Sequence, residues 1–452
     1  MTLLNELSAE VCQRARMSRD PRFDGRFFVA VKTTGIFCRP ICPANLPKEE
    51  NVEYFSSQAL AVSAGYRPCL RCRPESAPHS WAWKGAETTF LRALTLIEQG
   101  ELDGSLETLA SRLGISDRYL RQLFQRHLGM PPKQYAQIQQ LMFAKQLLHT
   151  SQISITEVAY ASGFQSTRRF NDAFQKLFRL TPTQVRRERA ALPSRNHLSL
   201  AFRGPFDWAH MLDFYRLRAI EGMELVDEQS YQRHFVLGEG TGWFKASMAQ
   251  SHLDIEFEME RLSDLRHLVA RLRRMFDLDA DLISIEAHLE QLAPGLVRRT
   301  GIRIPGVWNA WEAGVRAVLG QQVLVKAAIG QLNLLVSTLA ASEGSTRYFP
   351  TPEQVQMSDL SFLRMPERRK ETLKRLADYV RLHPMDSPMA WLSLSGIGPW
   401  TVDYAQLRGE SRSHCFLTGD LIVKKALAKF PQLTAESVAP WGSYATFHCW
   451  SH

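Results

Sequence analysis

The spacing of apolar residues divides the chain into helical and β-rich parts. The apolar pattern is typical of helices from Phe90 onward and again from Ile283 onward. Between these parts, the stretch His252–Met259 (HLDIEFEM) alternates apolar and polar residues with the period of a half-buried strand. Further short β-rich runs are expected at 197–202, 231–237 and 242–248, and amphipathic helices at 205–220 and 262–276. The pattern therefore predicts a multidomain, mainly α-helical chain with α+β parts.

An internal repeat marks the first helical part, with an offset of 49 to 50 residues. Residues 109–114 (LASRLG) match 158–163 (VAYASG), and Ser116, Phe124 and Pro132 match Ser166, Phe174 and Pro182. Each copy predicts a helix, a glycine-containing turn and a second helix, which is the DNA-binding helix-turn-helix pattern.

The second helix of each copy is expected to enter the major groove of DNA, over 116–127 and over 166–176. Arginine and asparagine side chains suit the edges of guanine and adenine. The candidate DNA-binding residues are Arg118, Arg121, Arg168, Arg169 and Asn171. For each arginine, a phosphate contact or a solvated helix face remains the alternative.

Composition supports a polyanionic partner. The chain has 452 residues, 45% of them hydrophobic, and a formal net charge of +9, which suggests three or four domains with real cores and makes DNA plausible. The opening segment is amphipathic and charged, and no apolar run is long enough to span a bilayer. With seven cysteines in so long a chain, a disulfide scaffold is disfavoured, and a cytoplasmic, nucleoid-associated protein without a membrane partner is expected.

Four cysteines have the spacing of metal ligands. Cys38, Cys42, Cys69 and Cys72 form the pattern C-x3-C-x26-C-x2-C. Two short spacings separated by a longer loop suit a tetrahedral zinc ion bound by four thiolates. Four unrelated free thiols are the alternative. Cys12, Cys415 and Cys449 lack any partner pattern and are expected to be ordinary thiols.

The surroundings of these cysteines resemble the N-terminal domain of the Ada adaptive-response family. The resemblance rests on 22–40 (RFDGRFFVAVKTTGIFCRP), 49–55 (EENVEYF) and 65–74 (GYRPCLRCRP). It implies one zinc ion and a reactive Cys38 that irreversibly takes a methyl group from a DNA phosphotriester, and a purely structural zinc site is the alternative. Arg39, Arg67, Arg71 and Arg73 are expected near phosphate. The helix-turn-helix pair resembles the AraC-type domain that follows in that family.

A second motif lies near the end of the chain. Gly396-Ile397-Gly398-Pro399 predicts a tight turn between two helical runs, with Pro399 opening the second helix. Its glycines permit close approach of a DNA backbone, and the N–H groups at the helix start can hold a phosphate. Asp420 follows in FLTGD, ahead of the helical run LIVKKALAKF. An ordinary helix hairpin and a helix N-cap are the alternative roles of these two features.

Together, the two features resemble the AlkA-type 3-methyladenine DNA glycosylases of the helix-hairpin-helix superfamily. The resemblance implies that Asp420 is catalytic, and that Trp400, Tyr404 and Trp450 line a pocket for a flipped, alkylated purine. Core aromatics are the alternative for Trp400 and Tyr404. Superfamily members that also cut the strand carry a lysine where Trp400 stands, so base removal without a lyase step is expected.

The same resemblance extends over 306–323, a segment that leads to a wedge loop in the family. Gln322, with Gln321 beside it, corresponds to the residue that fills the gap left by the flipped base. A polar pair at a helix start is the alternative. No chemistry is evident in the β-rich part. The chain ends two residues after Trp450, so a less complete C-terminal edge of the pocket is expected. A Pro-Cys-His-Arg nucleophile motif does not occur in the sequence, so repair of O6-methylguanine is not expected.

The combined prediction is an Ada–AlkA fusion in four parts. We expect a small zinc-bound α/β domain at 1–78, two helix-turn-helix units at 85–190, a small α+β domain at 196–282 and an all-α helix-hairpin-helix glycosylase domain at 283–452. The chain would activate transcription after methyl transfer to Cys38, with double-stranded DNA and RNA polymerase as partners. It would also hydrolyse the glycosidic bond of alkylated purines without a small-molecule cofactor.

Two alternatives and one choice remain open at this point. The glycosylase-like half could be a non-catalytic DNA-binding module of a regulator, or the zinc and helix-turn-helix parts could only recruit a repair enzyme to DNA. The sequence leaves open the preference among 3-methyladenine, 7-methylguanine and hypoxanthine.

Overall fold

The computed structural model of the chain describes residues 7–20, 23–69, 71–72, 74, 81–98, 100, 102, 105–187, 196–339, 342–343, 346–384 and 386–451. The chain divides into two compact units, Met1–Gln139 and Gln140–His452. Within the described residues, no helix is both long enough and apolar enough to cross a bilayer. The predicted class, a multidomain and mainly helical chain with small sheets, is confirmed.

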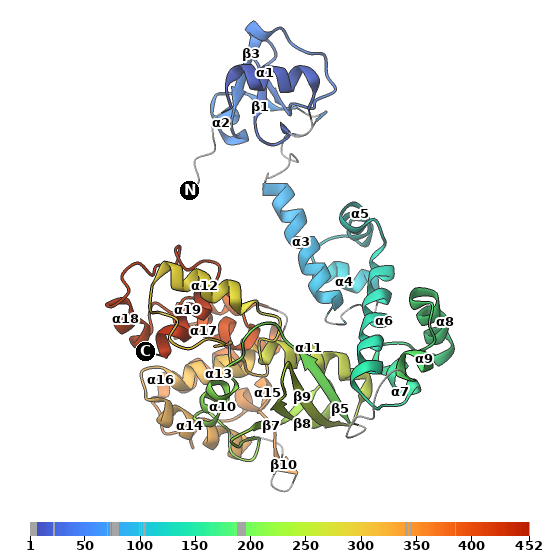
Figure 1. The fold of residues 1–452 in the computed structure, drawn as a ribbon. Helices are drawn as coiled ribbons and strands as arrows, with labels where there is room; N and C mark the ends of the chain where they lie inside the picture. Colours follow the sequence, from blue (N-terminus) through green and yellow to red (C-terminus); the bar gives the residue numbers. More distant parts are fainter. Residues whose placement is uncertain are drawn as a thin grey trace. The chain divides into compact units, whose positions relative to one another are not determined.

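A small sheet with the strand order β3-β1-β2-β4 opens the first unit (Figure 1). Successive side chains of strand β1 point to opposite faces of the sheet, and both faces are covered by hydrophobic clusters. Val29 belongs to the hydrophobic cluster that contains Cys12 of α1, and Ala30 belongs to the cluster that contains Ala61 of α2. The elements are α1 (Ala9–Ser18), β1 (Phe28–Val31), β2 (Ile36–Cys38), η2 (Glu49–Asn51), β3 (Val52–Phe55), α2 (Gln58–Ser63) and β4 (Arg67–Pro68).

The predicted repeat appears as two successive helix-turn-helix units. Ser116 caps the second helix of the first unit by accepting a hydrogen bond from the backbone N–H of Tyr119. Phe124 and Phe174, at equivalent positions of the repeat, are both 0% exposed. The elements are α3 (Trp81–Glu98), α4 (Leu106–Arg112), α5 (Asp117–Leu128), α6 (Pro132–Thr150), α7 (Ile155–Ala161), α8 (Thr167–Phe178) and α9 (Pro182–Arg187).

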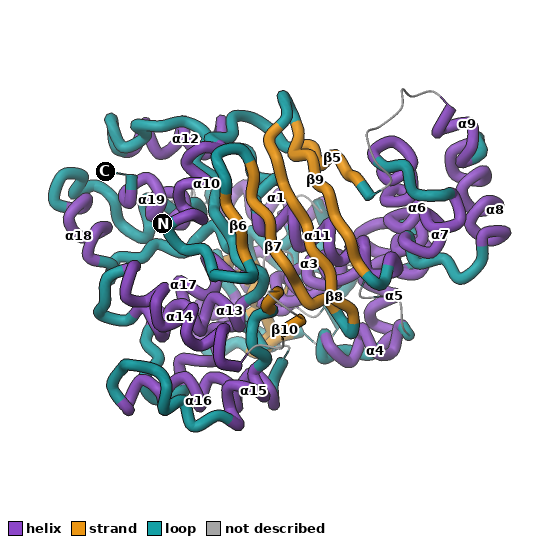
Figure 2. The backbone as a smooth tube through the Cα atoms, turned by 90° about the horizontal axis from the view of Figure 1, so that it is seen from below, coloured by secondary structure: helices purple, strands orange, loops and turns teal. Residues whose placement is uncertain are grey.

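The β-rich part forms an antiparallel sheet with the order β5-β9-β8-β7-β6, visible as neighbouring strands in Figure 2. Leu253, Ile255 and Phe257 of β9 are buried, as its alternating pattern predicts. The short β6 was not expected from the sequence. The elements are β5 (His197–Ala201), α10 (Trp208–Arg216), β6 (Glu224–Val226), β7 (Ser230–Leu237), β8 (Gly240–Met248), β9 (His252–Met259), η4 (Leu262–Asp264) and α11 (Leu265–Met275).

The remaining described chain is mainly helical and contributes most residues of two hydrophobic clusters. One cluster includes Val318 of α13 and Trp391, and the other includes Val423 of α18 and Phe447 of α19. The elements are α12 (Leu282–Leu292), α13 (Ala310–Gly320), α14 (Val325–Leu339), β10 (Ser342–Glu343), β11 (Thr346–Arg347), α15 (Pro352–Met357), α16 (Glu367–Leu382), η5 (Pro388–Ser393), α17 (Pro399–Glu410), α18 (Leu421–Leu427) and α19 (Gly442–Trp450).

A buried ion network joins the five-stranded sheet to α13. Arg233 of β7 contacts Glu224, at 2.7 Å, and Glu312 of α13. Arg316, one turn further along α13, contacts the same Glu312 at 2.8 Å. Removing one partner of such a buried pair leaves a charge without compensation, at a cost of about 3–5 kcal/mol. The network therefore fixes the sheet against the helix whose end forms one side of the pocket described below.

Candidate functional sites: a cysteine cluster and a pocket at Asp420

The four cysteines with metal-ligand spacing lie together in the first unit. Their sulfur atoms are all within 4.8 Å of one another. Strands β2 and β4 pair in parallel, with Phe37 opposite Pro68, and the backbone N–H of Cys69 donates to the carbonyl of Phe37 at 3.0 Å. This register places the ends of the two strands side by side. It therefore brings Cys38, the last residue of β2, to Cys69.

The donor set fits a zinc ion. Four thiolates about 2.3 Å from a tetrahedral zinc lie about 3.8 Å apart, which is compatible with the observed cluster. Cys42 and Cys69 are buried, whereas Cys38 and Cys72 are half-buried. A hydrogen bond from Cys38 lowers the pKa of Cys72 to about 6. The backbone N–H of Arg39 also points to the sulfur of Cys72, at 3.4 Å.

The arginines around the cluster differ in whether their charge is already paired within the protein. The Arg39 guanidinium binds the buried carboxylate of Asp24, with Nε 2.8 Å from Oδ1, so its charge is compensated within the protein. Arg67 and Arg71 are exposed. Arg73 lies outside the described residues. A cavity of about 330 Å³ lies beside Cys38, and it is lined by Val29, Thr34, Ile36, Arg39 and Leu46 among others.

The glycine-containing turn has the predicted form, and its first glycine is required. Pro399 is the first residue of α17, and Gly398 is its N-cap. Gly396 has a φ of +93°, and a Cβ atom there would lie 2.1 Å from the hydroxyl oxygen of Thr372. At Gly398, a Cβ would meet nothing within 4 Å. Only Gly396 is therefore fixed as glycine by its own surroundings.

Gln321 holds this turn rather than projecting freely. Its side-chain amide donates to the carbonyl oxygen of Gly396 at 3.1 Å and to the hydroxyl of Thr401 at 3.2 Å. Gln322 is exposed and has a φ of +57°, and both residues lie between α13 and α14 instead of at a helix start. In the same loop, Leu324 is 82% exposed.

Aromatic residues from distant parts of the chain line one pocket of about 510 Å³. Trp400 and Tyr404, one turn apart on α17, stack with ring centroids 5.3 Å apart. Trp450, at the end of α19, lies parallel to Phe214 of α10 at 6.3 Å. The structure thus brings the three predicted aromatics together with Asp420, and none of the four is fully buried.

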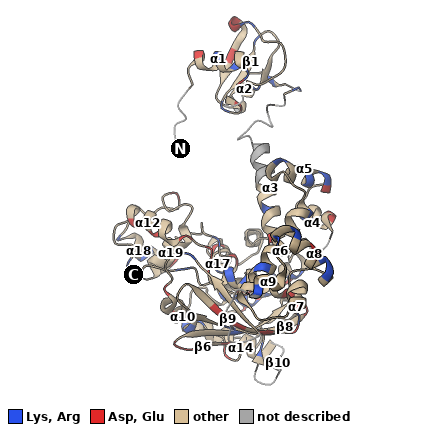
Figure 3. Cartoon of the chain, turned by 45° about the vertical axis from the view of Figure 1, so that its right-hand side comes forward, with Lys and Arg blue, Asp and Glu red and all other residues tan. Residues whose placement is uncertain are grey.

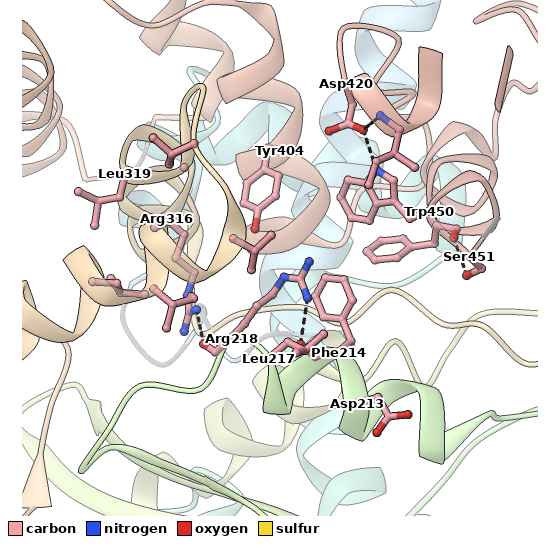
Figure 4. Close-up of a pocket in the computed structure, with 18 of the residues that line it drawn as sticks. Asp213, Phe214, Leu217, Arg218, Arg316, Leu319, Tyr404, Asp420, Trp450 and Ser451 are labelled. Atoms are coloured by element: carbon pink, nitrogen blue, oxygen red, sulfur yellow. Dashed lines mark hydrogen bonds between the residues drawn. The ribbon is translucent and has the colours of Figure 1, made fainter. Parts of the chain in front are cut away.

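Asp420 uses one of its two oxygens to cap a helix. Oδ1 accepts hydrogen bonds from the backbone N–H groups of Ile422, at 2.9 Å, and Val423, at 3.2 Å. The indole N–H of Trp450 donates to the same oxygen at 3.1 Å (Figure 4). From the described residues, Oδ2 accepts no hydrogen bond. The N-cap role and an available carboxylate oxygen therefore coexist.

The pocket opens onto a groove that also contains the glycine-containing turn. The groove has a volume of about 970 Å³ and shares Trp400 and Asp420 with the pocket. Gly396 and Gly398 lie along it, together with Gln321, Gln322, Leu324, Arg368, Arg369 and Leu421. An extended chain lying in the groove would therefore pass the mouth of the aromatic pocket.

The β-rich part, where the sequence showed no chemistry, contributes five of the residues that line the pocket: His210, Asp213, Phe214, Leu217 and Arg218. Phe214 of α10 and Arg218, just beyond this helix, both line the pocket. The Arg218 guanidinium lies 3.7 Å from the centre of the Phe214 ring. The amphipathic pattern of this helix predicts an apolar residue at Phe214 but gives no sign that it faces a pocket.

The helix-turn-helix units present the predicted polar residues on their second helices. Arg118 and Arg121 of α5 are exposed, as are Arg168, Arg169 and Asn171 of α8. Figure 3 shows basic residues on both helices. Arg121 forms an ion pair with Asp117 on its own helix, at 3.0 Å. The remaining exposed arginines leave each helix with positive charge for a phosphate or a base.

Comparisons with known proteins identify relatives of this chain. Family models match at 11–75 (metal binding domain of Ada), 109–188 (helix-turn-helix domain) and 197–309 (AlkA N-terminal domain). A probable bifunctional transcriptional activator/DNA repair enzyme AlkA of Mycobacterium tuberculosis is 34% identical over 98% of this chain and 96% of its own length.

Two proteins of Escherichia coli match separate parts of the chain. DNA-3-methyladenine glycosylase 2 is 33% identical over 56% of this chain and 96% of its own length. The bifunctional transcriptional activator/DNA repair enzyme Ada is 35% identical over 38% of this chain and 47% of its own length. The chain therefore belongs to the Ada–AlkA family of bifunctional transcriptional activators and DNA repair enzymes, with an Ada-type zinc site.

Proposed function

We propose that Asp420 is the catalytic carboxylate of a DNA glycosylase, and that Cys38 is the methyl acceptor of a transcriptional switch in the same chain. The observation that carries the first assignment is the position of Asp420 in an aromatic pocket beside a groove, with an Oδ2 atom that accepts no hydrogen bond from the described residues. The substrate is double-stranded DNA with an alkylated purine, such as 3-methyladenine.

The groove would hold the DNA backbone while the damaged base turns out of the stack. The N–H groups at the start of α17 can bind a phosphate next to Gly396 and Gly398, and Arg368 and Arg369 add positive charge. Gln322, with the exposed Leu324 in the same loop, would occupy the space left by the flipped nucleotide. Gln321 would position this loop through its bonds to Gly396 and Thr401.

In the pocket, the base would stack on Trp400, Tyr404 and Trp450. Electron-rich rings attract a cationic purine by about 0.5–2 kcal/mol per contact. As the glycosidic bond breaks, its electrons move to the base and the sugar gains positive charge. Oδ2 of Asp420 would stabilise that charge and orient the attacking water. Trp400 carries no amine for a Schiff base, so the product is an abasic site in an uncut strand.

At the other site, the Cys38 sulfur would attack the methyl carbon of a phosphotriester. A carbon–sulfur bond forms, the carbon–oxygen bond breaks, and the phosphate leaves as a diester anion. Zinc would be held by Cys38, Cys42, Cys69 and Cys72, and it supplies a thiolate at neutral pH. Methylation reduces the net charge of the site from −2 to −1, which lowers repulsion from the DNA backbone and raises affinity.

The two helix-turn-helix units would then hold the protein at a promoter, where RNA polymerase is the proposed partner and the nucleoid the proposed location. Arg118, Arg121, Arg168, Arg169 and Asn171 are the proposed DNA contacts. We keep the four-part division at 1–78, 85–190, 196–282 and 283–452 as a proposal for where these activities reside.

The direct test of the two activities uses methylated duplex DNA and the purified full chain. The proposal expects free 3-methyladenine, an abasic strand that stays intact until alkali is added, and transfer of labelled methyl from phosphotriesters to protein. The transfer should stop in Cys38→Ala, and promoter affinity should then no longer respond to methylated DNA. A chain that binds DNA but releases no base would instead be a regulator with a non-catalytic second half.

A further inference from the structure

A second cavity, of about 630 Å³, lies beside a different face of α14 from the aromatic pocket. Positions 325, 328, 329 and 332 of this helix line the aromatic pocket, whereas positions 330, 331, 333, 334 and 337 line the second cavity. Because an α-helix has 3.6 residues per turn, the two sets occupy separate faces of the helix. The second cavity also shares no lining residue with the groove at the glycine-containing turn. It is therefore a separate site.

Two side-chain amides in the second cavity are held with their NH2 groups unused. The side-chain oxygen of Asn333 accepts a hydrogen bond from the backbone N–H of Glu221 at 3.2 Å, and that of Gln331 accepts from the backbone N–H of Arg364 at 2.7 Å. These bonds fix which end of each amide is the oxygen. Among the residues that the structure describes, neither NH2 group donates to an acceptor. Each amide therefore offers donors to a ligand.

Two guanidinium groups add positive charge to the same cavity. Arg347 of β11 is half-buried, and its backbone N–H donates to the carbonyl oxygen of Gly222 at 3.0 Å. Arg364, between α15 and α16, is exposed. Neither guanidinium forms an ion pair or a hydrogen bond within the described part of the chain. Glu221 contributes one carboxylate, so two positive charges and one negative charge give the lining a net charge of +1.

Gly330 leaves part of this cavity open. It lies inside α14, where glycine is the least favourable residue apart from proline. A Cβ atom at this position would meet nothing within 4 Å, so close packing does not require a glycine here. The residue instead leaves space beside the amide and guanidinium donors.

We propose that the second cavity binds the phosphate group of a small phosphorylated molecule. Guanidinium and amide NH2 groups are all donors, and a phosphate accepts several hydrogen bonds and carries the opposite charge. Arg347 and Arg364 bind the phosphate oxygens, and Gln331 and Asn333 each add a donor. Glu221 favours a small molecule over a DNA backbone, because its carboxylate accepts from hydroxyl or amino groups but repels a continuous phosphodiester chain. This site is independent of base removal and of methyl transfer.

The test is calorimetric titration of the full chain with inorganic phosphate and with deoxyadenosine monophosphate, in a phosphate-free buffer. We expect Arg347→Met and Arg364→Met each to weaken binding of both ligands by about 10-fold or more, the effect of losing a hydrogen bond between charged groups. Asn333→Asp retains an acceptor for the backbone N–H of Glu221 but adds a negative charge, so it should weaken binding by a similar factor. Glu221→Gln removes a repulsive charge and should strengthen binding of inorganic phosphate by roughly threefold.

Gly330→Leu tests the cavity without changing a charge. Leucine is a good helix former, so α14 should be retained while the new side chain fills the cavity and abolishes binding. Arg381→Met is the matched control, because Arg381 is exposed on α16 and pairs with Asp378 at 2.9 Å outside the cavity. This variant loses the same charge and should bind both ligands as the wild type does. Thermal unfolding checks the fold of each variant.

The affinity for an undamaged duplex at several salt concentrations identifies the source of the phosphate. With a small molecule as the ligand, Arg347→Met and Arg364→Met should leave the salt dependence of duplex binding unchanged. A slope lowered by about one in each variant would support the phosphate site but assign it to the DNA backbone. Ligand binding that persists in Gly330→Leu and in both arginine variants would overturn the inference. Failure of the wild type to bind either ligand, with an unchanged salt dependence in the variants, would also overturn it.

Discussion

The cysteine cluster and the Asp420 pocket are built over very different lengths of chain. The cluster takes all its ligands from between Cys38 and Cys72, and one pair of parallel strands brings two of them together. The pocket combines side chains from Phe214 to Trp450, which meet only after a sheet and several helices have packed. A local site can thus depend on a metal for its geometry, whereas a dispersed site depends on the fold around it.

The two sites also hold their proposed reactive groups differently. Cys38 would be consumed by the reaction, because the methyl group remains on its sulfur. Asp420 is held through Oδ1, by two backbone N–H groups and Trp450, while Oδ2 receives no bond from the described chain. This division lets a carboxylate be fixed in position and still act on many substrates in turn.

Removal of zinc should have the largest effect, because it should abolish the activity of the cysteine cluster and leave the activity of the Asp420 pocket. Structural zinc contributes on the order of 10 kcal/mol to the folding of small zinc domains. Chelation, or Cys69→Ser at a buried ligand, should therefore abolish methyl transfer and unfold the zinc part. Base release by the same sample should stay within about twofold of the wild type, because the pocket lies in the other compact unit. A parallel loss of base release would contradict this independence.

The glycine turn gives the next largest expected effect. Gly396→Ala places a side chain at a φ of +93° and against Thr372, so it should lower the free energy of unfolding of the second unit by about 2 kcal/mol or more. Gly398→Ala, where nothing lies within 4 Å, serves as the control and should change stability by less than about 0.5 kcal/mol. Thermal unfolding and the affinity for undamaged duplex DNA measure both variants. Similar behaviour of the two would show that the close approach at Gly396 is unimportant.

The hydrogen bond from Trp450 to Asp420 should have a smaller effect. Trp450→Phe keeps an aromatic ring in the pocket but removes the indole donor to Oδ1. Loss of one hydrogen bond to a charged group should lower the rate of base release by about tenfold and leave methyl transfer to Cys38 unchanged. Single-turnover base release is the appropriate measurement. An unchanged rate would mean that the helix N-cap alone positions the carboxylate.

The sequence indicated most of what is encoded locally. Cys38, Cys42, Cys69 and Cys72 were identifiable because ligand spacing survives in the sequence, and the helix start at Pro399 because proline and glycine have specific backbone requirements. The strand β9 was also predicted, because its alternation of apolar and polar residues is a local pattern.

What the sequence did not indicate depends on tertiary contacts. Phe214 occupies an ordinary apolar position of an amphipathic helix, and Arg218 resembles a solvated charge at a helix end, until packing places both in the pocket. The role of Gln321 was missed for the same reason, because its hydrogen bonds to Gly396 and to Thr401 of α17 join residues that are far apart in the chain. The strand β6 is too short to show a period of its own.

The central claim is that Asp420 performs the chemistry of base removal, and Asp420→Asn tests it most directly. Asparagine is also a good N-cap, and its side-chain oxygen can still accept from Ile422 and Val423, so α18 and the fold should be retained. Base release from methylated duplex DNA should be measured beside the wild type, with thermal unfolding and DNA binding as checks. We predict release by the wild type and a loss of about 1,000-fold or more in the variant. Equal release by both would contradict the assignment of Asp420, and no release by either would contradict the enzyme.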